Sequence, residues 1–211
     1  QGGNTRTIQQ FTDRAVINWQ DFSVQQSEIT RFIQPSSSSV TLNRVIGGNP
    51  SAILGSLEAN GNVYLINPNG VLVGSGARIN VNGLVASTLG LGNEQFMQGG
   101  ELRFEGDSPA SIINNGEVRA LGGDIYLLSG RIENHGVLSA ENGTVGLAAG
   151  QNVQLVDAAS PSLVVKATPE SLGGTGILNT GLISAVQSEL IANGGNVYGL
   201  AINNEGVIRA N

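Results

Sequence analysis

Side chains that could perform acid–base, nucleophilic or metal chemistry are few and scattered in this sequence. His135 is the single histidine and cysteine is absent, so neither a zinc site nor a cysteine nucleophile is available, and a serine triad would depend on that one histidine. The five aspartates lie far apart, at Asp13, Asp21, Asp107, Asp124 and Asp157. Polysaccharide lyases and hydrolases need clustered carboxylates. We therefore expect no enzyme activity, no metal site and no cofactor.

The charge balance also narrows the range of partners. The formal net charge is −6, from sixteen acidic residues against nine arginines and Lys166, with no basic stripe. A protein that neutralises nucleic-acid phosphates needs such a stripe, so nucleic-acid binding is not expected. No apolar run approaches the length that spans a bilayer, which predicts no stable membrane insertion. We expect a monomer.

Glycine and asparagine dominate the composition and point to many tight turns. The 31 glycines and 22 asparagines make up a quarter of the chain, whereas aromatic residues make up only 4%. Gly and Asn accept turn conformations that other residues resist. The apolar residues, mainly Val, Ile, Leu and Ala, form short runs that favour strands over helices. The composition therefore indicates an all-β protein.

A repeat of twenty residues is the strongest pattern in the sequence. Residues 112–120 return as 132–140 with Ile, Asn, Gly and Ala in the same places, and residues 123–127 return as 143–147. Further copies lie at 61–65, 179–185, 195–198 and 204–210. A twenty-residue unit has no room for a helical crossover, so its strands must pair with equivalent strands of the neighbouring units. This predicts a right-handed parallel β-helix, with a β-sandwich as the structural alternative.

Period-two alternation within each unit indicates which side chains face the core. One face collects Val118, Ala120, Leu138, Ala140, Ile125, Leu127, Val145 and Leu147. Glu117, Arg119 and Tyr126 fall on the other face. At the turns, Asn114 and Asn134 occupy equivalent positions, and we expect their amides to stack in a ladder.

The ends and two irregular stretches depart from the repeat. We expect a single domain over 1–211, in which 1–35, which carries Trp19, is an N-terminal cap and 36–211 forms the coils. Excursions from the rod are expected near 92–110, where a short helix is plausible, and near 158–175. Because the sequence stops directly after a repeat, we expect it to be the N-terminal fragment of a larger exoprotein.

One run of motifs resembles a known family closely. The segment 61–71 contains Asn67, Pro68, Asn69 and Gly70, and it follows Phe-Ile-Gln-Pro at 32–35 and Leu-Asn-Arg-Val at 42–45. With Leu-Val-Ala-Ser-Thr at 84–88, these motifs resemble the two-partner secretion (TPS) domain of filamentous-haemagglutinin-like adhesins, haemolysins and haem-scavenging exoproteins. Val71 stands where this family usually has Ile. Asn43, Arg44 and Val45 occupy the region of the family's earlier Asn-Pro-Asn-Leu motif, which is missing.

This resemblance implies a right-handed β-helix with an N-terminal cap and extra-helical β elements. It implies a role as secretion signal and folding nucleus of a large bacterial surface exoprotein, recognised in the periplasm by the POTRA domains of a TpsB-type outer-membrane transporter. The exoprotein would reach the outside or the surface of a Gram-negative bacterium. The motif Asn67–Gly70 would be a recognition or structural motif, and Asn43, Arg44 and Val45 a first recognition region.

The Asn-Pro-Asn-Gly motif also has a structural explanation. This sequence favours a tight turn by itself, because Pro68 fixes φ while Asn69 and Gly70 tolerate positive φ. This structural role is compatible with contact to the transporter.

Two other functions stay open at this stage. An adhesive domain that binds host glycans or receptors would need grouped exposed aromatics, and Tyr64, Tyr126 and Tyr198 are few and far apart. A polysaccharide-degrading β-helix enzyme is the third possibility.

Overall fold

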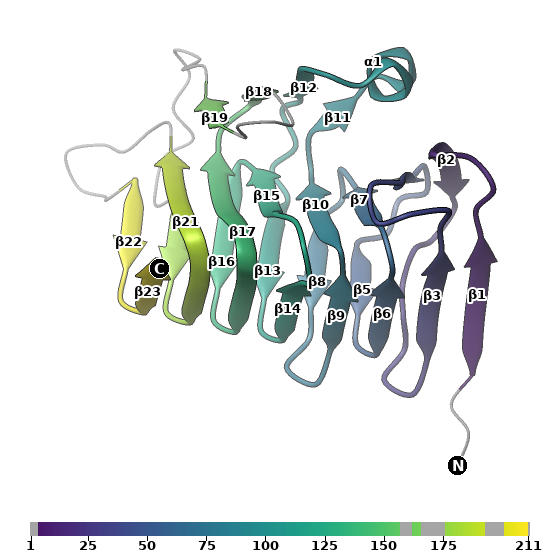
Figure 1. Ribbon diagram of the computed structural model, residues 1–211. Helices are drawn as coiled ribbons and strands as arrows, with labels where there is room; N and C mark the ends of the chain where they lie inside the picture. Colours follow the sequence, from purple (N-terminus) through teal and green to yellow (C-terminus); the bar gives the residue numbers. More distant parts are fainter. Residues whose placement is uncertain (1–3, 157–161, 166–175, 193–200, 211) are drawn as a thin grey trace.

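Each repeat folds into one coil of a right-handed parallel β-helix, and the coils stack into a rod (Figure 1). The computed structural model describes residues 4–156, 162–165, 176–192 and 201–210. Three walls enclose the core, and all strand pairs within them are parallel. The expected fold class is thus confirmed.

The first two walls are the halves of one 13-stranded sheet that bends around a corner. Wall 1 contains β1 (Thr5–Gln9), β3 (Ile29–Ile33), β6 (Ser56–Ala59), β9 (Arg78–Val81), β14 (Glu117–Ala120) and β23 (Val207–Ala210). Wall 2 contains β2 (Arg14–Trp19), β4 (Val40–Val45), β7 (Asn62–Ile66), β10 (Gly83–Ser87) and β15 (Ile125–Ser129). The long strands β17 (Val137–Ala149) and β21 (Leu182–Ala192) turn the corner and join the two walls.

Wall 3 is a six-stranded sheet of short strands. It contains β5 (Ser51–Ile53), β8 (Val71–Val73), β13 (Ser111–Asn114), β16 (Arg131–Asn134), β20 (Ile177–Asn179) and β22 (Ile202–Asn204). The twenty-residue register is confirmed where coils follow one another without an excursion. Val118 pairs with Leu138, and Asn114 pairs with Asn134.

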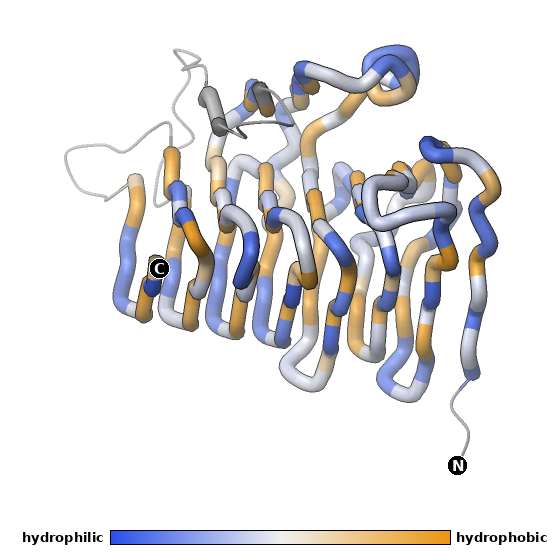
Figure 2. The backbone as a smooth tube through the Cα atoms, viewed as in Figure 1, coloured by the Kyte–Doolittle hydropathy of each residue, from blue (hydrophilic) through white to orange (hydrophobic). Residues whose placement is uncertain are grey.

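Hydrophobic and hydrophilic residues alternate along many of the strands (Figure 2), and their burial shows that this alternation divides core from surface as expected. The eight predicted core side chains all belong to one buried cluster and are at most 3% exposed. Glu117 and Arg119 point away from this core and form an ion pair with each other. Tyr126 also points outward, but it is only 5% exposed because a second layer covers it.

That second layer, called here the outer sheet, consists of antiparallel strands outside the rod. It contains β11 (Gly90–Leu91), β12 (Leu102–Glu105), β18 (Asn152–Val156) and β19 (Ser162–Val165), with α1 (Asn93–Gln98) between β11 and β12. The first predicted excursion, including its short helix, is therefore present. The second excursion lies largely outside the described residues.

Apolar side chains join the outer sheet and α1 to the outer face of wall 2. Phe96 and Phe104 of the excursion pack in one buried cluster with Leu42, Val85 and Leu128 of the wall. This cluster is separate from the core of the rod. A second hydrophobic interface therefore fixes the excursion on the coils.

The segment 1–35 follows the path of the coils where it is described. β1 and β2 pair in parallel with β3 and β4, so the first coil begins at Thr5. Its aromatic residues gather at this end of the core, where Trp19 contacts Phe22 edge-on at 5.2 Å. The guanidinium of Arg6 lies 5.9 Å from the Trp19 ring centroid. The capping role of this segment remains a proposal.

Candidate functional site

The Asn-Pro-Asn-Gly motif forms the turn between β7 and β8, at the corner of walls 2 and 3. The Gly70 N–H donates to the Asn67 carbonyl at 3.0 Å, which closes a β-turn. The side-chain oxygen of Asn67 accepts from the Asn69 N–H at 2.9 Å, as in an Asx-turn. Gly70 has φ +111°, a conformation that disfavours any side chain. The turn chemistry expected from the sequence is therefore present.

The Asn67 side chain ties this turn to the preceding coil. It is fully buried, and its amide nitrogen donates to the Asn49 carbonyl at 2.9 Å and to the Ser51 hydroxyl at 3.0 Å. The Asn69 amide reaches the same loop and donates to the Gly47 carbonyl at 2.9 Å. Pro68 is exposed on the outside of the turn. The motif thus joins two coils as well as bending the chain.

Asn43, Arg44 and Val45 lie in β4, beside the strand that leads into the motif. Arg44 pairs with Ile66, the residue that precedes Asn67, so the fold brings both candidate segments together. The side chains of Asn43 and Val45 are buried in the rod.

The buried Asn43 has a polar partner on each side. Its side-chain oxygen accepts from the Trp19 indole N–H at 2.9 Å, and its amide donates to the Tyr64 carbonyl at 3.3 Å. Arg44 points outward and donates to the Leu91 carbonyl and the Asn93 side chain. All three residues thus have structural contacts in the folded rod.

Gln34 also contributes to the turns near the motif, although it was not identified as a site residue from the sequence. Gln34 is 4% exposed, and its two amide N–H donors lie among three acceptors, the Ser39 carbonyl, the Thr41 hydroxyl and the Asn62 carbonyl, at 3.1 to 3.2 Å from the nitrogen. Its side-chain oxygen accepts from the Gly61 N–H at 3.0 Å. Its position in the Phe-Ile-Gln-Pro motif at 32–35 was the sequence feature that could have pointed to it. A buried amide with this many partners fixes the turns of the first coils.

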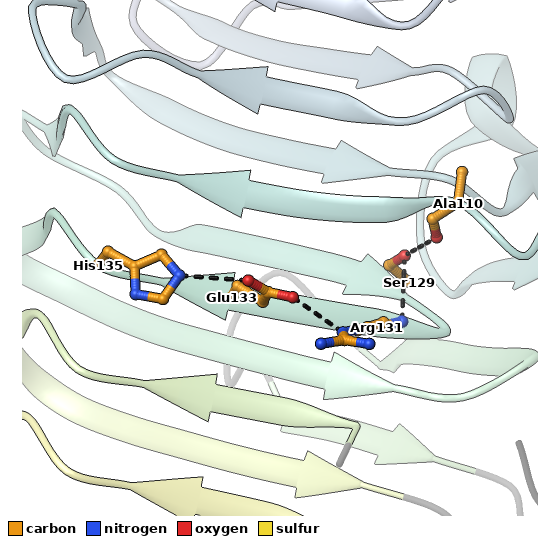
Figure 3. Close-up of polar contacts among 5 residues, drawn as sticks. All are labelled: Ala110, Ser129, Arg131, Glu133 and His135. Carbon is orange, nitrogen blue, oxygen red and sulfur yellow. Dashed lines mark hydrogen bonds and ion pairs between the residues drawn. The ribbon is translucent and has the colours of Figure 1, made fainter. Parts of the chain in front are cut away.

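His135 lies at the corner between walls 3 and 1, as its turn position suggested (Figure 3). Its Nδ1 is 2.7 Å from the Thr180 hydroxyl and its Nε2 is 3.2 Å from the Glu133 carboxylate. Glu133 also pairs with Arg131 at 2.9 Å. Asn134 pairs with Asn179 of the next coil, and His135 and Thr180 are the residues that follow them. The contact between His135 and Thr180 is therefore a result of coil stacking. These are surface contacts between neighbouring coils.

Burial alters the acid–base properties of a few groups on wall 2. Burial raises the pKa of the Asp124 carboxyl, although its bond from the Thr144 N–H at 2.7 Å opposes this effect. Burial also raises the pKa values of the Tyr64 and Tyr126 hydroxyls. Among the described residues, no three His, Asp or Glu side chains are grouped to hold a metal ion. In this same part of the chain, no helix is long and apolar enough to cross a membrane.

These features define a class: a parallel β-helix that carries an antiparallel outer sheet and an Asn-Pro-Asn-Gly turn bonded into its coils. The family model for the TPS secretion domain matches residues 1–211. The chain belongs to this family, which is a family of secretion domains of exoproteins.

The named relatives agree with this assignment. A heme/hemopexin-binding protein of the Rd strain of Haemophilus influenzae is 38% identical over 208 aligned residues, which cover 92% of this chain and 22% of the relative. Another heme/hemopexin-binding protein of H. influenzae is 54% identical over 82 residues, or 39% of this chain and 9% of the relative. The chain therefore spans less than a quarter of these proteins.

A solved structure supports the fold. The HMW1 secretion domain of H. influenzae superimposes with a TM-score of 0.72 and 32% identity over 89% of this chain and 53% of that structure. Sequence and structure thus agree on a secretion domain of an exported exoprotein.

Proposed function

We propose that POTRA domains of a TpsB-type outer-membrane transporter recognise this chain before it folds, and that its folding outside the cell then nucleates the exoprotein. The observation that carries the proposal is the burial of the motif. Asn67 and Asn43 are fully buried, and Asn67 makes four side-chain hydrogen bonds inside the rod. A partner that reads these side chains must meet them before the coils close.

Strand pairing supports the same order of events. β7 pairs with β4 on one side and with β10 on the other, so its backbone hydrogen bonds are satisfied in the rod. An unfolded chain can instead lend such a segment to the edge of another sheet by β-augmentation. The sheet edges of POTRA domains would then hold the chain until its own coils compete for the same hydrogen bonds.

The rod also offers a driving force for outward movement. Each added coil buries aliphatic side chains against the previous coil, as Leu127 and Leu147 do, and apolar burial contributes about 25 cal/mol per Å². Folding on the outer side would oppose backsliding through the transporter. This route takes the chain through the periplasm and outer membrane of a Gram-negative bacterium.

The alternative functions gain less support from the structure. Tyr64 and Tyr126 pack beneath the outer sheet and α1, so they do not form an exposed aromatic groove for glycans. Tyr198 lies outside the described residues. An enzyme is disfavoured by family membership and by the surface setting of His135.

Export with the cognate transporter tests the proposal. We expect Asn67→Ala and Asn69→Ala to reduce secretion of the chain into the medium, while Asn115→Ala, an exposed Asn that also precedes Gly, should not. Purified POTRA domains should bind the urea-unfolded chain more tightly than the folded rod. Normal secretion of both motif variants would show that the transporter does not recognise the motif. Secretion without the transporter would refute the proposal.

A further inference from the structure

We infer that residues 89–105, which carry β11, α1 and β12, form an intramolecular competitor of the transporter. Once β2, β4 and β7 have paired, docking of this segment on wall 2 holds the Arg44 guanidinium and prevents the transporter from recapturing the early coils. The inference rests on the proposed function and adds a release step to it. Two observations support it: two arginines donate hydrogen bonds to the segment, and the segment follows both arginines along the chain.

Arg44 makes the first of the two contacts. One guanidinium nitrogen donates to the Leu91 carbonyl at the end of β11, and another donates to the Asn93 side chain at the start of α1. Both are hydrogen bonds from a charged donor, which are stronger than neutral ones. These bonds use two of the five N–H donors of Arg44 and fix its guanidinium against the segment, so a transporter that contacts this face has to compete with β11 and α1 for it.

Arg14 makes the second contact, at the other end of α1. Its guanidinium donates to the Phe96 carbonyl at 2.7 Å and lies 5.3 Å from the centroid of the Phe96 ring. The ring is fully buried and meets Tyr64 edge-on at 5.6 Å. β2, β4 and β7 therefore all contribute to the docking surface.

Formation of α1 requires the outer face of wall 2. α1 has six residues, and its N-cap, Gly92, makes no side-chain capping bond. Isolated helices of this length are unstable in water, because nucleation is costly. Formation of α1 is therefore coupled to prior formation of the wall that receives it.

The order along the chain gives the contact a timing role. Leu91 follows Arg44 by 47 residues, and Phe96 follows Arg14 by 82. Arg44 stays available while the first coils are held and is withdrawn only when the later segment arrives. Folding of the excursion thus marks the point at which departure of the early coils from the transporter becomes irreversible.

Two neighbouring glycines supply a matched pair of variants. Gly99 and Gly100 both have positive φ, +73° and +80°. A Cβ at Gly99 would lie 2.8 Å from a guanidinium nitrogen of Arg14, whereas a Cβ at Gly100 would meet nothing within 4 Å. Gly99→Ala and Gly100→Ala therefore both place a side chain at positive φ, and only Gly99→Ala disturbs the arginine contact.

The test measures release of the 211-residue chain from immobilised POTRA domains of its transporter. Urea-unfolded chain is captured, urea is removed, and release is followed together with the fluorescence of Trp19, which reports folding of the first coils. We expect Gly99→Ala and Asn93→Ala to remain bound roughly tenfold longer than the native chain, the lower end of the effect expected for the loss of one hydrogen bond from a charged donor. Gly100→Ala should behave as the native chain does.

Each outcome has a defined meaning. If both Gly99→Ala and Asn93→Ala leave at the native rate while Trp19 reports normal folding, the competitor role is wrong and the proposed function stands. If Gly100→Ala is delayed as much as Gly99→Ala, backbone strain explains the delay and the arginine contact is also refuted. If the unfolded native chain is never captured, the proposed function fails, and the release step falls with it.

Discussion

The side-chain amide of Asn114 donates to the side-chain oxygen of Asn134 at 2.8 Å, although twenty residues separate them. The same bond repeats from Asn134 to Asn179 at 2.7 Å and from Asn179 to Asn204 at 2.6 Å. The first three amides are at most 1% exposed. The ladder predicted from the repeat therefore runs along the corner of four consecutive coils.

Breaking one rung of this ladder should destabilise the rod. Asn134→Ala removes the acceptor of one buried Asn114 N–H and the donor to the buried Asn179 side-chain oxygen, so we expect a loss of about 2–4 kcal/mol in the free energy of unfolding. Urea denaturation followed by circular dichroism measures it. Asn142→Ala is the control, because Asn142 is exposed and makes one long bond of 3.4 Å. Equal stability of the two variants would contradict a stabilising ladder.

Core stacking gives a second prediction. Leu127 and Leu147 pair in adjacent coils and are 3% and 0% exposed. Leu127→Ala or Leu147→Ala should each lower the free energy of unfolding by about 2–5 kcal/mol, because each leaves a cavity in a packed interior. Chemical denaturation of each variant measures this loss. A change near zero would mean that these side chains do not carry the packing assigned to them.

A column of glycines at one corner gives a third prediction. A Cβ on Gly136 would lie 2.1 Å from the carbonyl oxygen of Gly116, and one on Gly181 would lie equally close to that of Gly136. Gly136→Ala must therefore push two coils apart, at a cost near the upper end of the about 1–3 kcal/mol typical of overpacking. Thermal unfolding should show a clear decrease in Tm. Gly76→Ala, with nothing within 4 Å of its Cβ, should unfold like the native protein.

Asp124 gives a prediction about pH. Burial raises the pKa of this carboxyl above its unfolded value, so the folded state favours the protonated form. Its contribution to stability is present below the unfolded pKa of about 3.9 and is lost as pH rises through the folded pKa. Asp124→Asn keeps an acceptor for the Thr144 N–H and removes the charge. The variant should be more stable than the native chain at pH 7, and the difference should shrink towards pH 4.

Urea titrations of both proteins at pH 4, 5, 6 and 7 would measure this difference. A gain that stays constant over the series would show that ionisation of Asp124 is not its cause. A loss of stability at pH 7 would show that the charged carboxylate stabilises its bond to Thr144.

The repeat, the core positions and the amide ladder were determined by the sequence itself. Val118 and Leu138, like Asn114 and Asn134, carry equivalent residues at one spacing, and a stack of equivalent coils has to superimpose them. The turn at Asn67–Gly70 was equally predictable, because Pro and Gly restrict the backbone locally. These features depend on short stretches of chain and on their repetition.

Only the tertiary structure decided which contacts surround the motif. Tyr126 alternates outward as the pattern requires, yet it is buried because a segment outside the repeat folds over it. Arg44 and Leu91, like Arg14 and Phe96, meet across long separations that no period relates. Such contacts depend on where an irregular excursion docks, and its docking depends on the complete outer face of wall 2, which no single repeat encodes.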